Sequence, residues 1–251
     1  MTPKRTVAII QARMASTRLP GKVLLPLGGA TVIDCVIARV EAAEGIDAIC
    51  VAIPVGDRDE PLARHLSKKP GVSVVRGSEN DVLDRYMSAA TASDAGIIVR
   101  ITSDSPMIDP RVVSAVVAMQ RATGAAYAAT ALETGYPAGC DAEAFTRAAL
   151  TTAHAEARDQ YEREHVTPFL WRRPERFPAV YLDRKSDLRA LRMTLDTPED
   201  YEFASAVYAR LGQNPLFGVD AVVGLLAREP NLADINRDVK QTPYEFGGAR
   251  R

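Results

Sequence analysis

Cysteine is scarce in this 251-residue chain: the three cysteines, Cys35, Cys50 and Cys140, form no CxxC pair. An odd number of widely spaced cysteines does not build a disulfide framework, so we expect buried free thiols and a reducing compartment, the cytoplasm. The chain also lacks a basic excess, with 31 Lys and Arg against 32 Asp and Glu. A net charge of −1 excludes a general affinity for nucleic acid or anionic lipid, so an anionic ligand must be held by a local cluster.

Long apolar runs are missing as well, and the N-terminal residues show no signal-peptide pattern. We therefore expect no membrane association. Neither a Walker A loop nor a GxGxxG turn is present, and no HExxH pattern points to zinc. Hydrophobic residues make up 47% of the chain and charged residues 25%, the composition of an ordinary globular protein with a sizeable core.

Short apolar runs alternate with amphipathic stretches through the first half of the chain. The runs that read as strands are 7–11, 48–54, 72–77, 96–101 and 125–130. The stretches between them carry helical periodicity, and Asp109 with Pro110 is typical of a helix start. This alternation predicts an α/β fold: a mostly parallel sheet with helices on both faces.

Unusual polar stretches follow three of these strands, at residues 13–22, 76–85 and 102–109. Ligands in such sheets bind beyond the carboxyl ends of the strands, so the three stretches are expected to meet at one site. The first stretch carries Arg13, Arg18 and Lys22 around a Pro20-Gly21 turn. Guanidinium and ammonium groups suit phosphate, but a solvated loop with scattered basic residues fits the spacing equally well.

Asp104 and Asp196 each follow a predicted strand. Asp109 already fills the helix-cap role near Asp104, whereas Asp196 is itself a good candidate N-cap. Two carboxylates facing one triphosphate would make a magnesium site, because Mg²⁺ is held by one or two carboxylates together with phosphate oxygens and water. His165 lies in "EREHVTP", where spacing alone favours a charged helix start.

The second half of the sequence is less regular. A short strand is expected within "LRMTLDTPED", followed by a helix that starts at Asp196 or Thr197. One more helix is expected within 215–230, and the tail after it is polar and expected to be loosely held.

Six motifs occur in an order and spacing that resemble a known family. They are "IIQARMASTRLPGKVLLPLGG", "RGSENDVLDRY", "VRITSDSPMIDP", "YPAGCDAEAF", "EREHVTPFL" and "RMTLDTPEDY". Together they resemble the cytidylyltransferases, in particular the branch of the spore coat polysaccharide biosynthesis protein F, with CMP-Kdo and CMP-sialic acid synthetases as more distant relatives. The resemblance implies a nucleotide-diphospho-sugar transferase-like α/β fold. It also implies Mg²⁺-dependent transfer of CMP from CTP to a sugar-type acceptor, an acidic sugar being expected, with release of pyrophosphate.

The resemblance also assigns roles to residues. The residues expected to be catalytic are Arg13, Lys22 and Asp104, and Asp104 and Asp196 are expected to hold the metal. Nucleotide binding is expected from Ala12, Arg13, Arg18, Lys22, Arg76, Asp84, Arg85 and Thr102. Acceptor binding is expected from Tyr136, Asp141, Glu162, Arg163 and His165.

The same resemblance suggests how the chain is divided. Residues 1–211 are expected to form the nucleotidyltransferase domain, with a core at 7–130 and an acceptor and dimerisation insert at about 131–190; residues 212–251 form a helical extension and tail. A homodimer is expected, with Val166, Phe169, Leu170 and Trp171 in its interface, although this cluster could equally pack on the chain's own sheet. Two rival functions remain: a glycosyltransferase, whose usual Asp-x-Asp motif is incomplete in "SDSP", and a non-catalytic nucleotide-binding protein.

Overall fold

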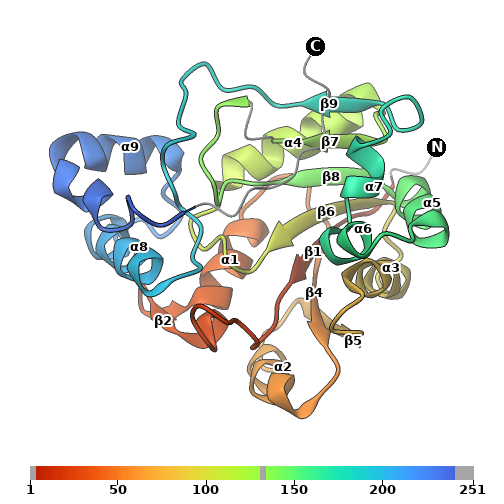
Figure 1. Cartoon of the computed structure of the whole chain (residues 1–251), viewed down its shortest axis with the longest axis horizontal. Coiled ribbons are helices and arrows are strands. Elements are labelled where there is room, and N and C mark those ends of the chain that lie inside the picture. Colours follow the sequence, from red (N-terminus) through yellow and green to blue (C-terminus); the bar gives the residue numbers. More distant parts are fainter. Residues whose placement is uncertain (1–3, 131–133, 241–251) are drawn as a thin grey trace.

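A seven-stranded sheet forms the centre of the computed structural model, which describes residues 4–130 and 134–240 (Figure 1). Its strands, in spatial order, are β5 (Val72–Gly77), β4 (Ala48–Pro54), β1 (Thr6–Gln11), β6 (Ile97–Thr102), β8 (Glu143–Thr146), β7 (Tyr127–Ala129) and β9 (Ala179–Tyr181). The first four are mutually parallel, β8 is antiparallel to both neighbours, and β9 is parallel to β7. The predicted mostly parallel sheet is confirmed.

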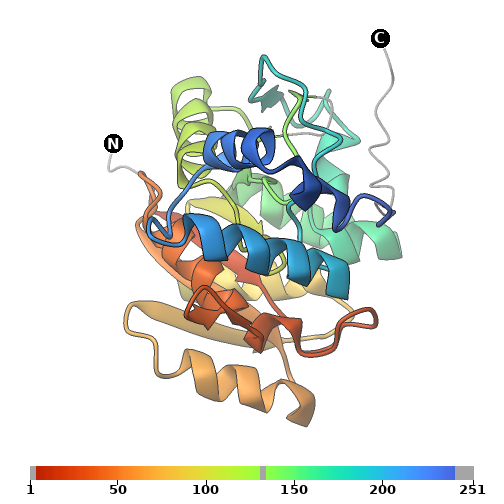
Figure 2. The same cartoon turned by 90° about the vertical axis from the view of Figure 1, so that its left-hand side faces the viewer.

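Helices cover both faces of the sheet, because neighbouring residues of a strand point in opposite directions. In β1, Val7 and Ile9 pack into one apolar cluster and Ala8 and Ile10 into the other. The first cluster is closed by α3 (Val82–Ala92), α5 (Arg147–Glu156), α6 (Gln160–His165) and α7 (Pro168–Trp171). The second is closed by α1 (Val32–Glu41), α2 (Glu60–Leu66), α4 (Pro110–Thr123), α8 (Pro198–Leu211) and α9 (Val219–Arg228), of which α8 and α9 face the viewer in Figure 2.

Local sequence signals set most helix boundaries. Asp109 caps α4 through the N–H of Arg111, as expected, and the helix ends at Gly124 with φ 66°. Thr197, rather than Asp196, caps α8 through a reciprocal pair of bonds with Asp200. The strand predicted just before α8 is not formed: Arg192 makes only an isolated bridge with Ala138, because no neighbouring strand extends alongside the rest of this segment.

The segment after α9 corrects the expectation of a loose tail. Residues 230–234 form the 3₁₀ turn η4, where Leu232 is buried against the second apolar cluster. Asn236 beyond it is also buried. The packed tail therefore extends at least to Asn236, while residues 241–251 lie outside the described part of the chain.

The apolar cluster proposed for a dimer interface lies inside the chain. Val166, Phe169, Leu170 and Trp171 are each at most 6% exposed and pack in the first cluster, where Phe169 meets Phe177 edge to face. Their placement in the interface was wrong, because α5 and the sheet already bury them. All three cysteines are buried and unpaired, as predicted. No helix within the described ranges is both long and apolar enough to cross a bilayer.

Candidate nucleotide and metal site

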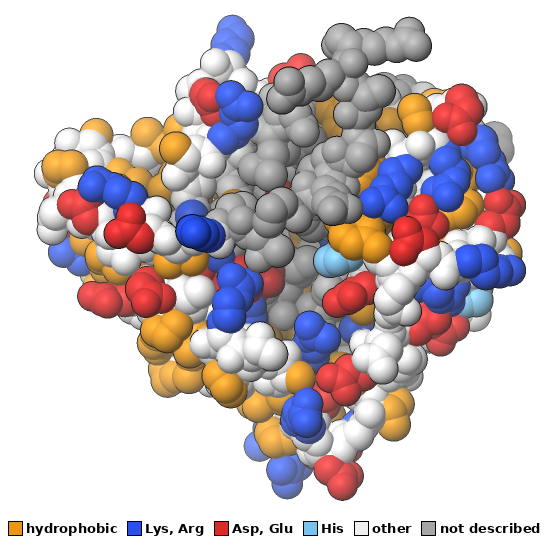
Figure 3. Space-filling view, in the orientation of Figure 1, with side chains coloured by type: hydrophobic (Ala, Val, Ile, Leu, Met, Phe, Trp, Pro, Cys, Tyr) orange, Lys and Arg blue, Asp and Glu red, His pale blue; other side chains and the backbone are white. Residues whose placement is uncertain are grey.

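A cleft of about 230 Å³ opens at the carboxyl ends of β1 and β6. Its lining combines residues of the loop after β1, the loop after β6, the start of α3, the end of α6, and Asp196. The predicted site residues among them are Ala12, Arg13, Arg18, Lys22, Arg85, Thr102, Asp104, His165 and Asp196. Figure 3 shows acidic and basic side chains intermixed around the middle of this face. The polar stretches after the first, third and fourth predicted strands thus contribute to one cleft, as expected.

The loop after β1 is held in a defined shape by its backbone. The N–H of Met14 donates to the buried carboxylate of Asp59 (2.7 Å), and the N–H of Gly21 donates to the carbonyl of Met14 (3.1 Å). Gly21 has φ 69°, a conformation that costs glycine little. This turn sends Lys22 inward, where its side chain is largely buried.

The ammonium group of Lys22 lies between the two predicted metal ligands. Its Nζ is 2.9 Å from Asp196 Oδ1 and 3.5 Å from Asp104 Oδ2, and it donates to the carbonyl of Leu195 (2.8 Å). The two carboxylates therefore converge on one point, which already holds a cation. No cluster of three or more Asp, Glu, His or Cys side chains suited to a metal occurs in the described ranges. Two carboxylate donors fit Mg²⁺ when phosphate oxygens and water supply the remaining ligands.

Backbone pairing brings Asp196 to Asp104 although they are far apart in sequence. The carbonyl of Asp104 accepts from the N–H of Leu195 (2.7 Å) and from the hydroxyl of Thr194 (3.1 Å). The N–H of Ser103 in turn donates to the carbonyl of Gln11 at the end of β1 (3.1 Å). The three segments that carry Lys22, Asp104 and Asp196 are thus joined by direct hydrogen bonds.

Asp196 is ionised and surrounded by cations. Burial alone would raise the pKa of its carboxyl, but Lys22, Arg18 and Arg192 together lower it below its usual value. Arg18 lies 3.1 Å and Arg192 2.9 Å from Oδ2, while Lys22 contacts Oδ1. Both oxygens of Asp196 therefore have cationic partners in this state.

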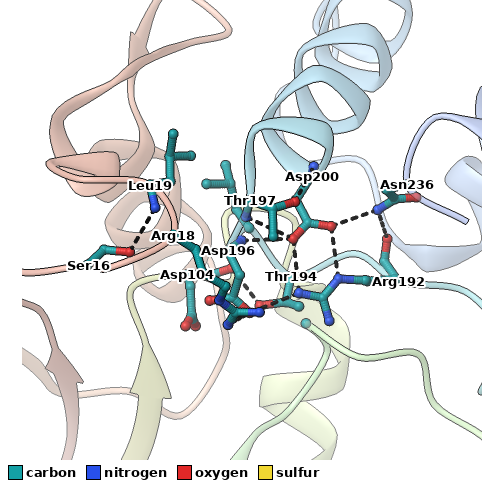
Figure 4. Close-up of polar contacts among 12 residues, drawn as sticks. Ser16, Arg18, Leu19, Asp104, Arg192, Thr194, Asp196, Thr197, Asp200 and Asn236 are labelled. Carbon is teal, nitrogen blue, oxygen red and sulfur yellow. Dashed lines mark hydrogen bonds and ion pairs between the residues drawn. The ribbon is translucent and has the colours of Figure 1, made fainter. Parts of the chain in front are cut away.

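Sequence reasoning missed three residues behind Asp196. Arg192, Asp200 and Asn236 form a buried hydrogen-bonded cluster beside it (Figure 4). Only Asp200 had a signal in the sequence, because "TPED" places it at the third position of a capped helix. Arg192 and Asn236 had none, since their partners are set by tertiary packing.

Arg13, Arg85 and His165 also line the cleft. Arg85 is 2% exposed and donates to the carbonyls of Ser78 and Glu79, and burial lowers its pKa. Arg13 is exposed and, among the described residues, makes no hydrogen bond or ion pair. It is therefore available to an anion that enters the cleft.

His165 ends α6 just before a strained turn. Val166 has φ 72° and ψ −57°, and the N–H of Thr167 donates to the carbonyl of His165 (2.9 Å). Such a conformation is costly for a β-branched residue and persists only where its surroundings enforce it. Here the hydroxyl of buried Thr167 donates to Glu143 (2.7 Å), which pairs with Arg100 of β6. Burial and the nearby Arg100 lower the pKa of the His165 ring.

Six predicted site residues do not line the cleft: Arg76, Asp84, Glu162, Arg163, Tyr136 and Asp141. Arg76, on edge strand β5, pairs with Glu60. Asp84 lies on the face of α3 that meets α5, where it contacts His154 (2.9 Å).

Two charged residues shortly before His165, Glu162 and Arg163, form ion pairs with other parts of the chain. Buried Glu162 accepts from Arg173 (2.7 Å), and Arg163 pairs with Asp81 (2.6 Å). Neither side chain lines the cleft, although Glu164 and His165 next to them do, because successive residues of a helix point in different directions. Tyr136 and Asp141 lie in the loop before β8 and do not line this cleft; Asp141 accepts from the N–H of Gly139 (3.0 Å).

Comparison with known proteins agrees with this arrangement. The family model described as cytidylyltransferase matches residues 7–218. The spore coat polysaccharide biosynthesis protein SpsF of Bacillus subtilis is 33% identical over 232 residues, which cover 90% of this chain and 95% of that protein. The 3-deoxy-manno-octulosonate cytidylyltransferase of Anaeromyxobacter sp. strain K is 28% identical over 242 residues, covering 82% and 98%.

A solved structure of a cytidylyltransferase from Leptospira borgpetersenii superposes with a TM-score of 0.86 at 30% identity, covering 96% of this chain and 100% of that one. The fold is therefore the nucleotide-diphospho-sugar transferase-like α/β fold that the sequence led us to expect. With a family match over most of its length and a full-length structural counterpart, the chain is a member of the cytidylyltransferase family.

Proposed function

We propose that this enzyme transfers CMP from CTP to a hydroxyl group of a sugar acceptor, with Mg²⁺ as cofactor and pyrophosphate as the second product. The observation that carries the proposal is the convergence of Asp104 and Asp196 on the position that the Lys22 ammonium group holds, in a cleft that Arg13 also lines. Support comes from the family match and from a relative named for cytidylyl transfer to 3-deoxy-manno-octulosonate. No separate observation favours a glycosyltransferase or a non-catalytic protein.

The reaction needs no nucleophile from the protein. The acceptor oxygen attacks the α-phosphorus in line, the bond to the β-phosphate oxygen breaks, and pyrophosphate leaves with that electron pair. Catalysis of this kind consists of positioning and of stabilising the charge on the leaving group. Arg13 and Lys22 supply that stabilisation, and Arg18, which also lines the cleft, assists.

Asp104 and Asp196 are the residues that would hold the metal ion. A Mg²⁺ ion bound there would supply polarisation of the phosphate oxygens of the nucleotide and partial neutralisation of their charge. Lys22, which contacts both carboxylates in the structure, would then turn to the phosphate oxygens. The ionised state of Asp196, which its cationic neighbours favour, is the state that binds a metal.

His165 acts as the general base that accepts the proton of the attacking hydroxyl group. Its ring lines the cleft and has a lowered pKa, so it is neutral and able to accept a proton at neutral pH. Among the described lining residues, Glu164 is the other base outside the metal position. An acidic sugar remains the proposed acceptor class.

The direct test is a substrate screen. Each of the four nucleoside triphosphates is incubated with Mg²⁺ and a panel of sugars that includes 3-deoxy-manno-octulosonate, and pyrophosphate release is measured. Mass spectrometry of the product identifies a CMP-sugar. Acceptor-dependent pyrophosphate release with CTP supports the proposal. Transfer of a sugar from a sugar nucleotide, or CTP binding without turnover on any acceptor, would contradict it.

We further propose that the enzyme is a cytoplasmic homodimer. The three buried free thiols suit a reducing compartment. The dimer contact must use a surface other than the buried Val166–Trp171 segment. Light scattering at micromolar concentration should give twice the monomer mass, and the monomer mass would reject the dimer.

A further inference from the structure

We propose that Asn236, together with Arg192 and Asp200, positions Asp196 for joint binding of metal and nucleotide. This inference rests on the proposed metal site and adds a part of the chain that the family model, which ends at residue 218, does not include. It makes the C-terminal segment a component of the site.

Asp200 is the centre of the cluster. Its carboxylate is fully buried and accepts five hydrogen bonds (Figure 4). The donors are Arg192 Nε (2.8 Å), Arg192 Nη2 (2.9 Å), Asn236 Nδ2 (3.0 Å), and the backbone N–H groups of Asp196 (3.0 Å) and Thr197 (3.1 Å). One of the five comes from the backbone N–H of Asp196, the predicted metal ligand, so Asp200 fixes the backbone position of Asp196.

Arg192 fixes the side chain of the same ligand. Its terminal nitrogen Nη2 lies 2.9 Å from Asp200 Oδ2 and 2.9 Å from Asp196 Oδ2, so one planar group spans both carboxylates. A guanidinium has a rigid fork of donors, which holds two acceptors at a set angle. Asp196 Oδ1 is thereby turned toward Lys22 and Asp104, where a cation is held.

The charge of Asp200 has a separate effect. Arg192 and Asp200 are both almost fully buried and neutralise each other. If Asp200 lost its charge, the full positive charge of Arg192 would act on Asp196, which already faces Lys22 and Arg18. A metal cation would then meet a less negative ligand. Asp200 therefore favours metal binding through charge as well as through geometry.

Asn236 ties this cluster to the C-terminal segment. Its side-chain amide donates to Asp200 Oδ1 (3.0 Å) and to the carbonyl of Arg192 (3.2 Å), and it is 5% exposed. The amide thus contacts both members of the pair that orients Asp196. Leu232, one turn earlier, anchors the segment in the second apolar cluster.

The experiment measures binding rather than turnover. Mn²⁺ is used as the probe metal, and its affinity in the presence of CTP is measured by electron paramagnetic resonance for the wild type, Asn236→Ala and Asp200→Asn. Loss of groups that orient a metal ligand typically weakens metal affinity 10- to 100-fold. We expect a loss of that size in both variants, while CTP binding without metal, measured by calorimetry, changes less than about two-fold.

Asn231→Ala is the matched control, because Asn231 is an exposed asparagine of the same segment. It should keep wild-type Mn²⁺ affinity. A purely structural role for Asn236 would lower the melting temperature but leave Mn²⁺ affinity unchanged in the folded protein, which would overturn the inference. If Asp200→Asn does not fold, Arg192→Lys serves instead: it keeps the charge but cannot span both carboxylates, and it should weaken Mn²⁺ binding in the same way.

Failure of the proposed function gives a different result from failure of this inference. A wild-type protein that binds no Mn²⁺ in the presence of CTP contradicts the metal site, and with it the positioning role. A wild type that binds Mn²⁺ with CTP, together with variants of equal affinity, contradicts the positioning role alone.

Discussion

Lys22 and Asp196 form an ion pair of 2.9 Å across a sequence separation of 174 residues. This pair places an ammonium group at the position where the two predicted metal ligands converge. A divalent cation and Lys22 Nζ cannot both occupy that position. At the proposed metal site, the pair would therefore tie metal binding to a group that draws Lys22 away, as the triphosphate of the proposed substrate CTP would do.

The first prediction concerns this linkage. Mg²⁺ should bind weakly to the protein alone and at least 10-fold more tightly in the presence of CTP, because the triphosphate provides new partners for Lys22 and direct ligands for the metal. Titration calorimetry with and without CTP measures both affinities. Equal Mg²⁺ affinity in the two titrations would show that Lys22 does not compete with the metal.

A second prediction concerns the role of Lys22 toward the nucleotide. Lys22→Ala should weaken CTP binding about 10- to 150-fold, since a hydrogen bond to a charged group contributes about 1.5–3 kcal/mol. The same variant should bind Mg²⁺ more tightly than the wild type when CTP is absent, because Asp104 and Asp196 lose their competing cation. Lys68→Ala, which removes an exposed lysine in the turn after α2, is the control. Unchanged CTP affinity in Lys22→Ala would contradict its assignment.

Asp104→Asn tests the metal position by turnover. Asparagine keeps the shape of the side chain but removes the charge, and the backbone carbonyl of Asp104 still accepts from Leu195 and Thr194. We therefore expect a folded protein with an unchanged circular dichroism spectrum and a loss of Mg²⁺-dependent pyrophosphate release of 100-fold or more. Near-normal turnover on an acceptor used by the wild type would refute the role of Asp104.

Much of the fold could be predicted because it is encoded locally. Short β-branched runs gave the parallel strands, and Asp109 with Pro110 gave the start of α4. The position of the cleft followed from the rule that ligands bind beyond the carboxyl ends of parallel strands, which placed Lys22 and Asp104 at the same edge.

The rest of the arrangement depends on interactions that no local pattern records. Glu162 and Arg163 lie next to the cleft-lining Glu164 in sequence, yet their side chains point to Arg173 and Asp81 because the helix turns between neighbouring residues. Asn236 was assigned to a loose tail because its polar neighbours show no periodicity. Only its contacts with the Arg192 carbonyl and with Asp200 explain why it is buried.

The last prediction concerns proton transfer by His165. Burial and Arg100 lower the pKa of its ring below the usual 6.5, Arg172 acts in the same direction, and Glu164 and Glu143 oppose them. A base with a lowered pKa is neutral at pH 7 and becomes protonated only in more acidic solution. The wild-type rate should therefore be independent of pH near neutrality and fall as pH drops through a midpoint below 6.5.

His165→Gln should lower kcat by 100-fold or more and abolish this acidic limb, because general base catalysis contributes about 10²- to 10⁴-fold. CTP affinity should stay near that of the wild type, since the proton comes from the acceptor. Glu164→Gln is the matched control and should keep the limb. Thr167→Val should lower kcat less than His165→Gln, because it loosens the turn without removing the base. If His165→Gln keeps the wild-type pH profile, the proton goes to another group, and a loss of the limb in Glu164→Gln would identify Glu164 as that group.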